Sequence, residues 1–173
     1  MVPSKRASFL ATYRRDQDFS LPDSIMFYIA KNPSSAKVYQ KMIQSCKYFF
    51  VQNPILVFSH LHCCYETKWE TFSNNMPVSL DETFSKIWVT DEIFVDNLSS
   101  TEQNSFSSIV SKIYRSDIKE LSLMNQFISF ADLIFLTSKC EMSVIFGGEN
   151  GEEFDVPFEK ILEVLPKLRG LSL

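Results

Sequence analysis

The feature that most constrains the fold is a short alternating segment that recurs in the second half of the chain. Residues 119–123 read Lys-Glu-Leu-Ser-Leu, and similar alternation of polar and apolar residues returns at residues 141–144 and 170–173. Such alternation is typical of a half-buried strand, because successive side chains of a strand point to opposite faces. The intervals of roughly 20 to 30 residues are those of strand-plus-helix repeats that stack to bury a continuous core.

An apolar stretch with a phenylalanine near its start precedes each copy, at Phe106, Phe130 and Phe158. It would supply the helix of each unit, and the first of these helices is expected to begin near Ser99 and to run to about Tyr114. A weaker first strand is expected at residues 86–90, which are rich in β-forming side chains. These features together predict a degenerate α/β solenoid over residues 86–173.

The first half of the chain has helical spacing instead. Leu21-Pro22-Asp23 is typical of a helix start, and apolar positions then recur through residues 23–31 until Asn32-Pro33 ends the helix. Ser34 or Ser35 can cap a second helix, and a third is expected at about residues 47–51, before Asn53-Pro54. The apolar stripe of the second helix consists of Val38, Tyr39, Met42, Ile43 and Cys46. Three such short helices have little core of their own, so some of Tyr28, Tyr48 and Phe49-Phe50 should lie at an interface.

The predicted organisation is therefore α+β. Residues 1–19 form a flexible tail, residues 20–56 a helical module, residues 57–85 a linker and residues 86–173 the repeats. The chain has only 4 glycines, which argues against an enzyme that binds phosphate on a glycine-rich loop. Its net charge of −4 argues against a nucleic-acid partner. The sequence has neither an apolar run long enough for a bilayer nor the apolar core of a signal peptide, so an intracellular protein with reduced thiols and no membrane partner is expected.

The N-terminal module resembles an F-box. The resemblance lies in Leu21-Pro22, the spaced aliphatics Ile25 and Ile29, the Cys46-Lys47 pair and the following Asn53-Pro54-Ile55-Leu56, in the order that the family has them. The residues near the C-terminus, 161–173, look like the helix-to-strand passage of a leucine-rich repeat, and the whole is similar to the divergent F-box-like and leucine-rich proteins of nematodes. Ser24 stands where an acid is common in the family, and the repeats lack the asparagine that usually follows each strand.

The resemblance implies a substrate-recruiting adaptor of a cullin-RING ubiquitin ligase. The module would dock on the Skp-type adaptor protein, and the repeats would hold an unknown protein substrate. The implied docking residues are Leu21, Pro22, Ile25, Ile29, Val38 and Met42, with Lys47 at the rim. Alternatively, the helices use the same apolar stripe to cap the solenoid, and the protein is a free-standing interaction scaffold.

Candidate chemistry is sparse. His60, His62, Cys63 and Cys64 are the only clustered metal-ligand types, with Cys46 or Cys140 as distant additions, but they lack the second separated pair of a zinc motif. A nucleophilic Cys63 or Cys64 beside His60, as in a small hydrolase, lacks any motif for the oxyanion. Residues 147–153 are glycine-rich and acidic but lack calcium-loop or P-loop spacing, so they are expected to form a polar loop. No catalytic residue, metal or cofactor is therefore predicted.

Overall fold

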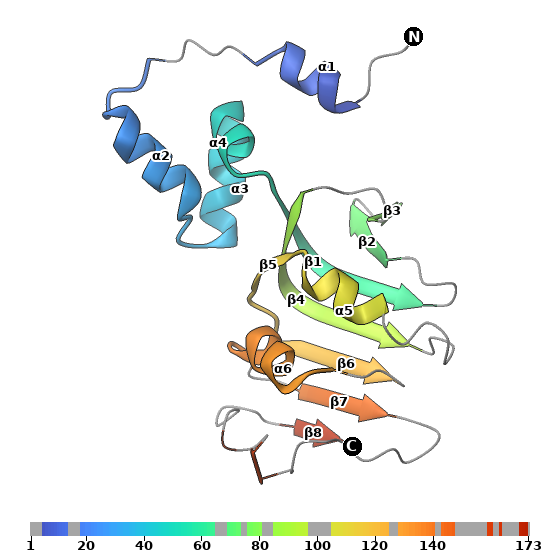
Figure 1. Ribbon diagram of the computed structural model, residues 1–173. Coiled ribbons are helices and arrows are strands. Elements are labelled where there is room, and N and C mark those ends of the chain that lie inside the picture. Colours follow the sequence, from blue (N-terminus) through green and yellow to red (C-terminus); the bar gives the residue numbers. More distant parts are fainter. Residues whose placement is uncertain are drawn as a thin grey trace. The chain divides into compact units, whose positions relative to one another are not determined.

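The computed structural model describes residues 5–13, 18–64, 69–73, 76–80, 85–96, 105–124, 128–140, 143–147, 159–160, 163 and 170–172. Its fold is mixed α+β, as predicted, and the chain divides into two compact units, Met1–Ile55 and Leu56–Leu173 (Figure 1). The first unit is helical, and the second is built on one sheet.

Helices form at the three segments that the sequence predicts. These are α2 (Asp23–Lys31), α3 (Ala36–Ser45) and α4 (Lys47–Gln52). Ser35 caps α3, and its hydroxyl accepts a hydrogen bond from the backbone N–H of Val38 at 3.3 Å. The small core of this unit consists of Met26, Ala30 and Phe49.

The first 19 residues, predicted to be a flexible tail, contain the helix α1 (Lys5–Ala11). Seven residues have little helical stability alone, because a short helix makes few internal hydrogen bonds. The ring of Phe9 meets the ring of Phe50 edge-on, with centroids 5.5 Å apart, so packing on α4 holds α1. A contact between segments about 40 positions apart leaves no local signal in the sequence.

The second unit contains an eight-stranded sheet in the order β3-β2-β1-β4-β6-β7-β8, with β5 paired to β4. The strands are β1 (Ile55–Cys64), β2 (Trp69–Ser73), β3 (Met76–Ser79), β4 (Lys86–Asp96), β5 (Ile113–Ser116), β6 (Glu120–Met124), β7 (Ser143–Gly147) and β8 (Gly170–Ser172). β1, β2 and β3 pair antiparallel, whereas β4, β6, β7 and β8 run parallel and their arrows point the same way (Figure 1).

The prediction of a linker over residues 57–85 is wrong, because β1, β2 and β3 occupy most of it. Strands that bury only one face carry polar residues at every second position, so a pair of such strands has the polar composition of a linker. Trp69, Thr71 and Leu80 are all buried in this segment. The predicted first strand at residues 86–90 is confirmed but extends to Asp96.

The later strands follow the predicted alternation. The backbone register aligns Glu92, Glu120, Ser143 and Gly170, so equivalent positions recur at intervals of 28, 23 and 27 residues. The predicted strands at 119–123, 141–144 and 170–173 are thus confirmed over their described residues. The helix expected to reach Tyr114 is wrong at its end: α5 (Ser105–Val110) stops at Val110, and β5 pairs Ile113 with Ile87.

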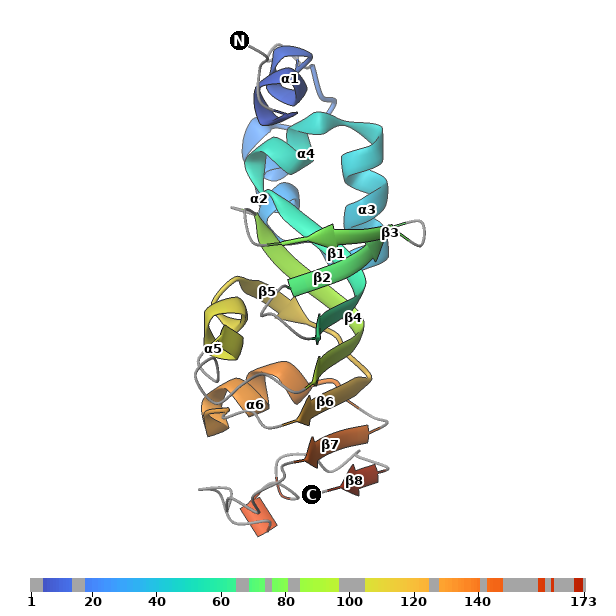
Figure 2. The same cartoon turned by 90° about the vertical axis from the view of Figure 1, so that its right-hand side faces the viewer.

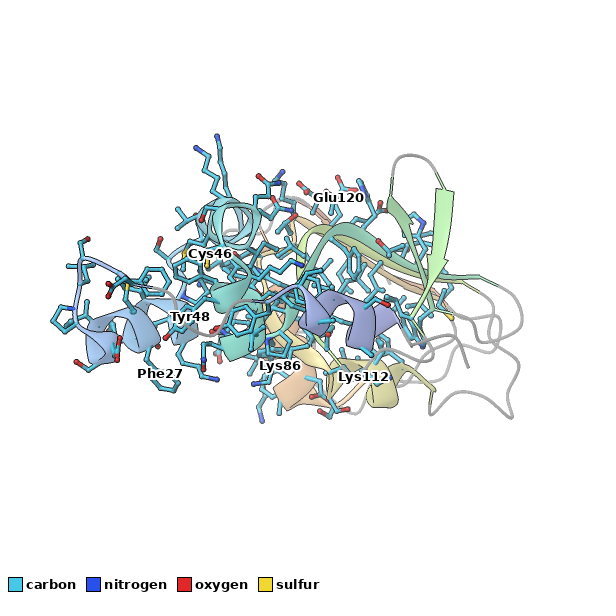
Figure 3. The ribbon with its side chains drawn as sticks, turned by 90° about the horizontal axis from the view of Figure 1, so that it is seen from above. Phe27, Cys46, Tyr48, Lys86, Lys112 and Glu120 are labelled. Carbon is cyan, nitrogen blue, oxygen red and sulfur yellow. The ribbon has the colours of Figure 1, made fainter. Side chains whose placement is uncertain are left out.

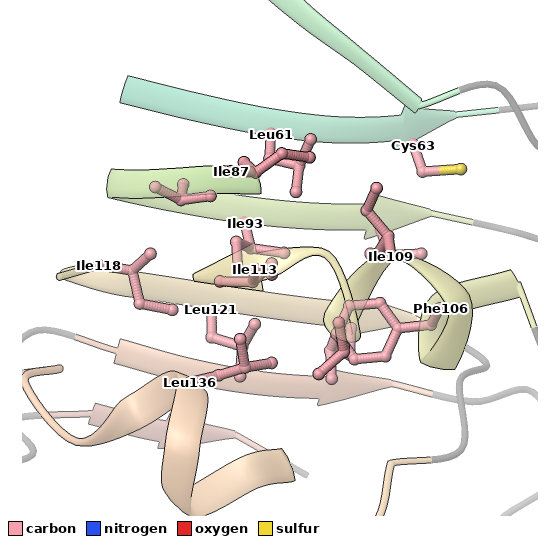
Figure 4. Packing of buried hydrophobic residues seen from close by; sticks show 14 of the residues in the cluster. Leu61, Cys63, Ile87, Ile93, Phe106, Ile109, Ile113, Ile118, Leu121 and Leu136 are labelled. Carbon is pink, nitrogen blue, oxygen red and sulfur yellow. The ribbon is translucent and has the colours of Figure 1, made fainter. Parts of the chain in front are cut away.

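The described helices of this unit, α5 and α6 (Phe130–Thr137), lie on the same face of the sheet (Figure 2). Ile93 and Leu121 point from their strands toward Phe106 of α5 and Leu136 of α6, and all four are buried (Figure 4). This apolar layer between strands and helices is the main core. Among the described residues, no helix is both long and apolar enough to cross a membrane.

Candidate protein-interaction surface

Large apolar side chains are exposed on α2 and the start of α3. α2 buries Met26 and Ala30, one helical turn apart, so the residues on its other faces point outward. Leu21, Ile25, Phe27, Tyr28 and Val38 are exposed by 46%, 45%, 49%, 67% and 41%. In the part of the chain that the structure describes, the other exposed large apolar residues are Ile134 and Phe135 on α6. We call the five residues of the first unit the α2–α3 surface.

The predicted docking residues divide into three groups. Leu21, Pro22, Ile25 and Val38 are exposed, and all but Pro22 belong to the α2–α3 surface. Ile29 and Met42 are half-buried and pack against the small core of Met26, Ala30 and Phe49. Lys47 is half-buried and contacts α1.

Two exposed aromatics extend the surface beyond the predicted set. The sequence predicts that some of Tyr28, Tyr48, Phe49 and Phe50 lie at an interface. Tyr28 is the most exposed of these four aromatic residues, whereas Phe49 is buried. Phe27 was not predicted. It points away from the helices of its unit (Figure 3), and the Lys31 ammonium lies 5.4 Å from its ring centroid. Phe27 lies three residues before the buried Ala30, a spacing that places two residues on the same side of a helix, so the helical period does not reveal its exposure.

A set of buried hydrogen bonds connects α2, α3 and the end of α4 and fixes how these helices pack together. The buried hydroxyl of Tyr39 donates to the carbonyl of Asn53 at 2.6 Å and accepts from the N–H of Ile55 at 3.1 Å. The Asn53 amide donates to the carbonyl of Ala30 at 3.1 Å, at the end of α2. These bonds tie the ends of the helices together where the apolar core is small.

Tyr48 lies beside this core and against the aromatic ring of Phe19, with centroids 5.1 Å apart. Burial raises the pKa of Tyr48, and the negative charge of Asp23 raises it further. Tyr48 therefore stays a neutral phenol that packs as an aromatic ring.

The second unit presents a different kind of surface, the face of its sheet opposite α5 and α6. Glu92 and Glu120 are register partners on neighbouring strands, and Glu120 projects from this face (Figure 3). His62 Nε2 lies 3.3 Å from Glu92 Oε2, and the His62 ring lies 5.7 Å from that of Phe94. This part of the face therefore carries two carboxylates, an imidazole and an aromatic ring, in contrast to the apolar α2–α3 surface.

A network of ion pairs lies at the connection between β5 and β6. Asp117 accepts from the Trp88 indole at 3.0 Å and from Arg115 at 3.0 Å, and it contacts the Lys139 ammonium at 2.6 Å. Burial raises the pKa of Asp117, but the donors Lys139, Arg115 and Trp88 outweigh burial and hold this pKa below its ordinary value. Hydrogen bonds from Lys119 likewise lower the pKa of Asp91.

The histidine–cysteine cluster is divided between the two faces of β1. Cys63 is buried in the apolar core between sheet and helices, whereas the rings of His60 and His62 lie together, with centroids 6.0 Å apart. This separation removes the pairing of Cys63 with His60 that a nucleophile needs. The side chain of Cys64 lies outside the described residues, as do residues 148–153 of the predicted polar loop.

The other two candidate thiols have structural contacts. Cys46 Sγ accepts from the N–H of Tyr48 at 3.3 Å at the start of α4, and Cys140 Sγ donates to the carbonyl of Lys119 at 2.8 Å. Within the described ranges, no group of three or more His, Cys, Asp or Glu side chains is placed to hold a metal ion.

Comparison with known proteins finds no matching family model, no matching curated relative and no matching solved structure. The function must therefore be inferred from the surfaces of this chain.

Proposed function

We propose that the protein is a non-enzymatic, substrate-recruiting adaptor that docks through its helical unit on the Skp-type protein of a cullin-RING ubiquitin ligase. The observation that carries the proposal is the α2–α3 surface, which leaves five large apolar side chains in contact with solvent. Large apolar side chains exposed together on one pair of helices favour protein association, because burying them removes apolar area from water. Leu21, Ile25 and Val38 belong both to this surface and to the F-box resemblance.

The second unit supports the other half of the proposal, a surface for a protein substrate. Four parallel strands lie side by side in their chain order, β4-β6-β7-β8, with β5 also paired to β4, and the described helices between them lie on one face. Stacked strand-plus-helix repeats have this order, and leucine-rich repeats bind proteins on the strand face. The sheet face that carries Glu92 and Glu120 is the corresponding surface here.

The test is a binding measurement between the full chain and a purified Skp-type adaptor. Ile25→Asp places a charge inside the proposed contact, and Ile134→Asp is its matched control, because Ile134 is also a helical isoleucine and is 38% exposed against 45% for Ile25. We expect Ile25→Asp to weaken binding by at least about tenfold, since a buried unpaired carboxylate costs more than about 1.4 kcal/mol. Ile134→Asp should bind as the wild type does.

The double variant Leu21→Ala/Pro22→Ala tests binding through the same surface without introducing charge, and it should also bind the Skp-type protein more weakly than the wild type does. Circular dichroism of each variant establishes that it is folded. Equal binding by wild type, Ile25→Asp and the double variant would refute docking through the α2–α3 surface, and no binding by folded wild type would refute the ligase adaptor itself.

A free-standing repeat scaffold is the second candidate, and the sequential parallel strands favour it without requiring a ligase. It predicts that the wild-type chain does not bind the Skp-type protein. The same binding experiment therefore decides between the two candidates.

A further inference from the structure

The segment Lys5-Arg6-Ala7-Ser8-Phe9 combines two basic residues, a serine and a following aromatic residue. Basic-directed protein kinases select serines of this type, because acidic groups in their substrate grooves pair with basic residues two and three positions before the serine. Ser8 is exposed on α1. α1 is only seven residues long, so local opening can present this segment to a kinase in extended form.

The surroundings of α1 show where a phosphate on Ser8 would lie. Lys47 of α4 donates to the carbonyl of Phe9 at 3.3 Å and to the hydroxyl of Thr12, and its ammonium lies 4.4 Å from the centroid of the Phe9 ring. Thr12 directly follows the last residue of α1, Ala11, and lies four residues after Ser8, the spacing that brings helical side chains to the same side. Ser8 directly precedes Phe9, the residue whose carbonyl and ring contact the Lys47 ammonium.

We propose that Ser8 is a phosphorylation site for a basic-directed, ATP-dependent serine kinase, and that Lys47 receives the phosphate. In the transfer, Ser8 Oγ forms a bond to the γ-phosphorus of ATP, the bond from that phosphorus to ADP breaks, and the hydroxyl proton passes to the kinase. The product carries a charge near −2 beside the Lys47 ammonium.

Phosphorylation strengthens the contact between α1 and α4. The new charge-assisted hydrogen bond adds to the three contacts that Lys47 makes with Phe9 and Thr12, and it costs little further ordering because that side chain is already held. The modification thus fixes α1 on α4 and occupies Lys47. This inference does not depend on ligase binding.

The first test is labelling of the full chain by ATP and the catalytic subunit of cyclic-AMP-dependent protein kinase, with the site located by mass spectrometry. We expect one phosphate on Ser8, loss of the label in Ser8→Ala and a lower initial rate in Arg6→Ala. Ser24 is the internal control, because it is exposed on a helix but has no basic residue in the preceding positions. Absence of label at Ser8, or labelling of Ser24 at the same rate, would overturn the site.

The second test is hydrogen exchange of residues 9–12 before and after labelling. We expect the phosphate to slow exchange roughly two- to fivefold, the effect of one partly exposed ion pair. Lys47→Met keeps the aliphatic stem and removes the charge, so it should abolish this slowing while leaving the labelling of Ser8 intact. Equal slowing in Lys47→Met would show that Lys47 does not receive the phosphate.

Discussion

At the scale of single residues, the hydroxyl of Tyr39 satisfies two backbone groups that are buried with it, the carbonyl of Asn53 and the N–H of Ile55. Tyr39→Phe keeps the ring and removes both hydrogen bonds. We expect the free energy of unfolding of the helical unit to fall by about 1–3 kcal/mol, because buried polar groups lose their partner. Urea unfolding followed by far-ultraviolet circular dichroism measures the change.

Tyr28→Phe is the matched control, because this tyrosine is 67% exposed and water can replace its hydrogen bonds. It should change the stability by less than about 0.5 kcal/mol. Equal effects of the two substitutions on the free energy of unfolding would mean that the hydrogen bonds of Tyr39 at Asn53 do not stabilise the helical unit. The sequence predicts that Asn53-Pro54 ends a helix, and α4 does end there, but it does not show that Asn53 also bonds to the carbonyl of Ala30. That bond joins two helices, so no local pattern records it.

At the scale of elements, the network around Asp117 links β4, β5 and the residues that follow α6. The pKa of Asp117 is lowered in the folded protein, so the folded state favours the carboxylate more than the unfolded state does. The stabilisation is therefore present above the ordinary pKa of 3.8 and is lost as the pH falls through the lowered folded value. We expect Asp117→Asn to be less stable than the wild type near neutral pH, with the difference shrinking below about pH 4.

The measurement is the unfolding midpoint in urea as a function of pH, followed by fluorescence of Trp69 and Trp88, both in the second unit. Asp18→Asn is the control because Asp18 is exposed and belongs to the helical unit, so it should leave the unfolding midpoint reported by the two tryptophans of the second unit unchanged. A constant difference between Asp117→Asn and wild type at all pH values would exclude the charge of Asp117 as the source of stability.

The sequence predicts some elements and misses others for identifiable reasons. β6 was predicted because Leu121 and Leu123 alternate with polar residues, and both are buried. The end of α5 was misplaced because Ile113 continues the apolar pattern after Val110, although its backbone pairs with β4. Of the α2–α3 surface, the sequence predicts Leu21, Ile25 and Val38, but the exposure of Phe27 depends on how α2 packs on α4.

At the scale of the whole molecule, the two units have very different cores. Among the described residues, the apolar cluster of the helical unit has three buried members, with Tyr39 buried outside it, whereas the cluster between the sheet and its helices has 18. Apolar burial is the main favourable contribution to folding, so the helical unit has much less stabilisation of its own. Its exposed α2–α3 surface would add the missing burial once a partner covers it.

This difference predicts unequal hydrogen exchange in the free protein. Amides of α2, α3 and α4 should exchange at least about tenfold faster than those of β4 and β6, which corresponds to a local opening free energy lower by about 1.4 kcal/mol. Adding the Skp-type protein at 100 times its Kd should protect α2 and α3 by about 2.7 kcal/mol, because a ligand stabilises the state that it binds. The amides of β6 should change little, since that strand lies in the other unit.

Ile25→Asp separates this effect from nonspecific stabilisation by added protein. The variant should show the fast exchange of α2 and α3 with and without the Skp-type protein, while Ile134→Asp should gain the protection that the wild type gains. Equal exchange of the helices and β6 in the free chain would show that the two units open together, so that the small core of the helical unit does not set its stability. Protection of β6 in place of α2 would move the docking surface to the sheet.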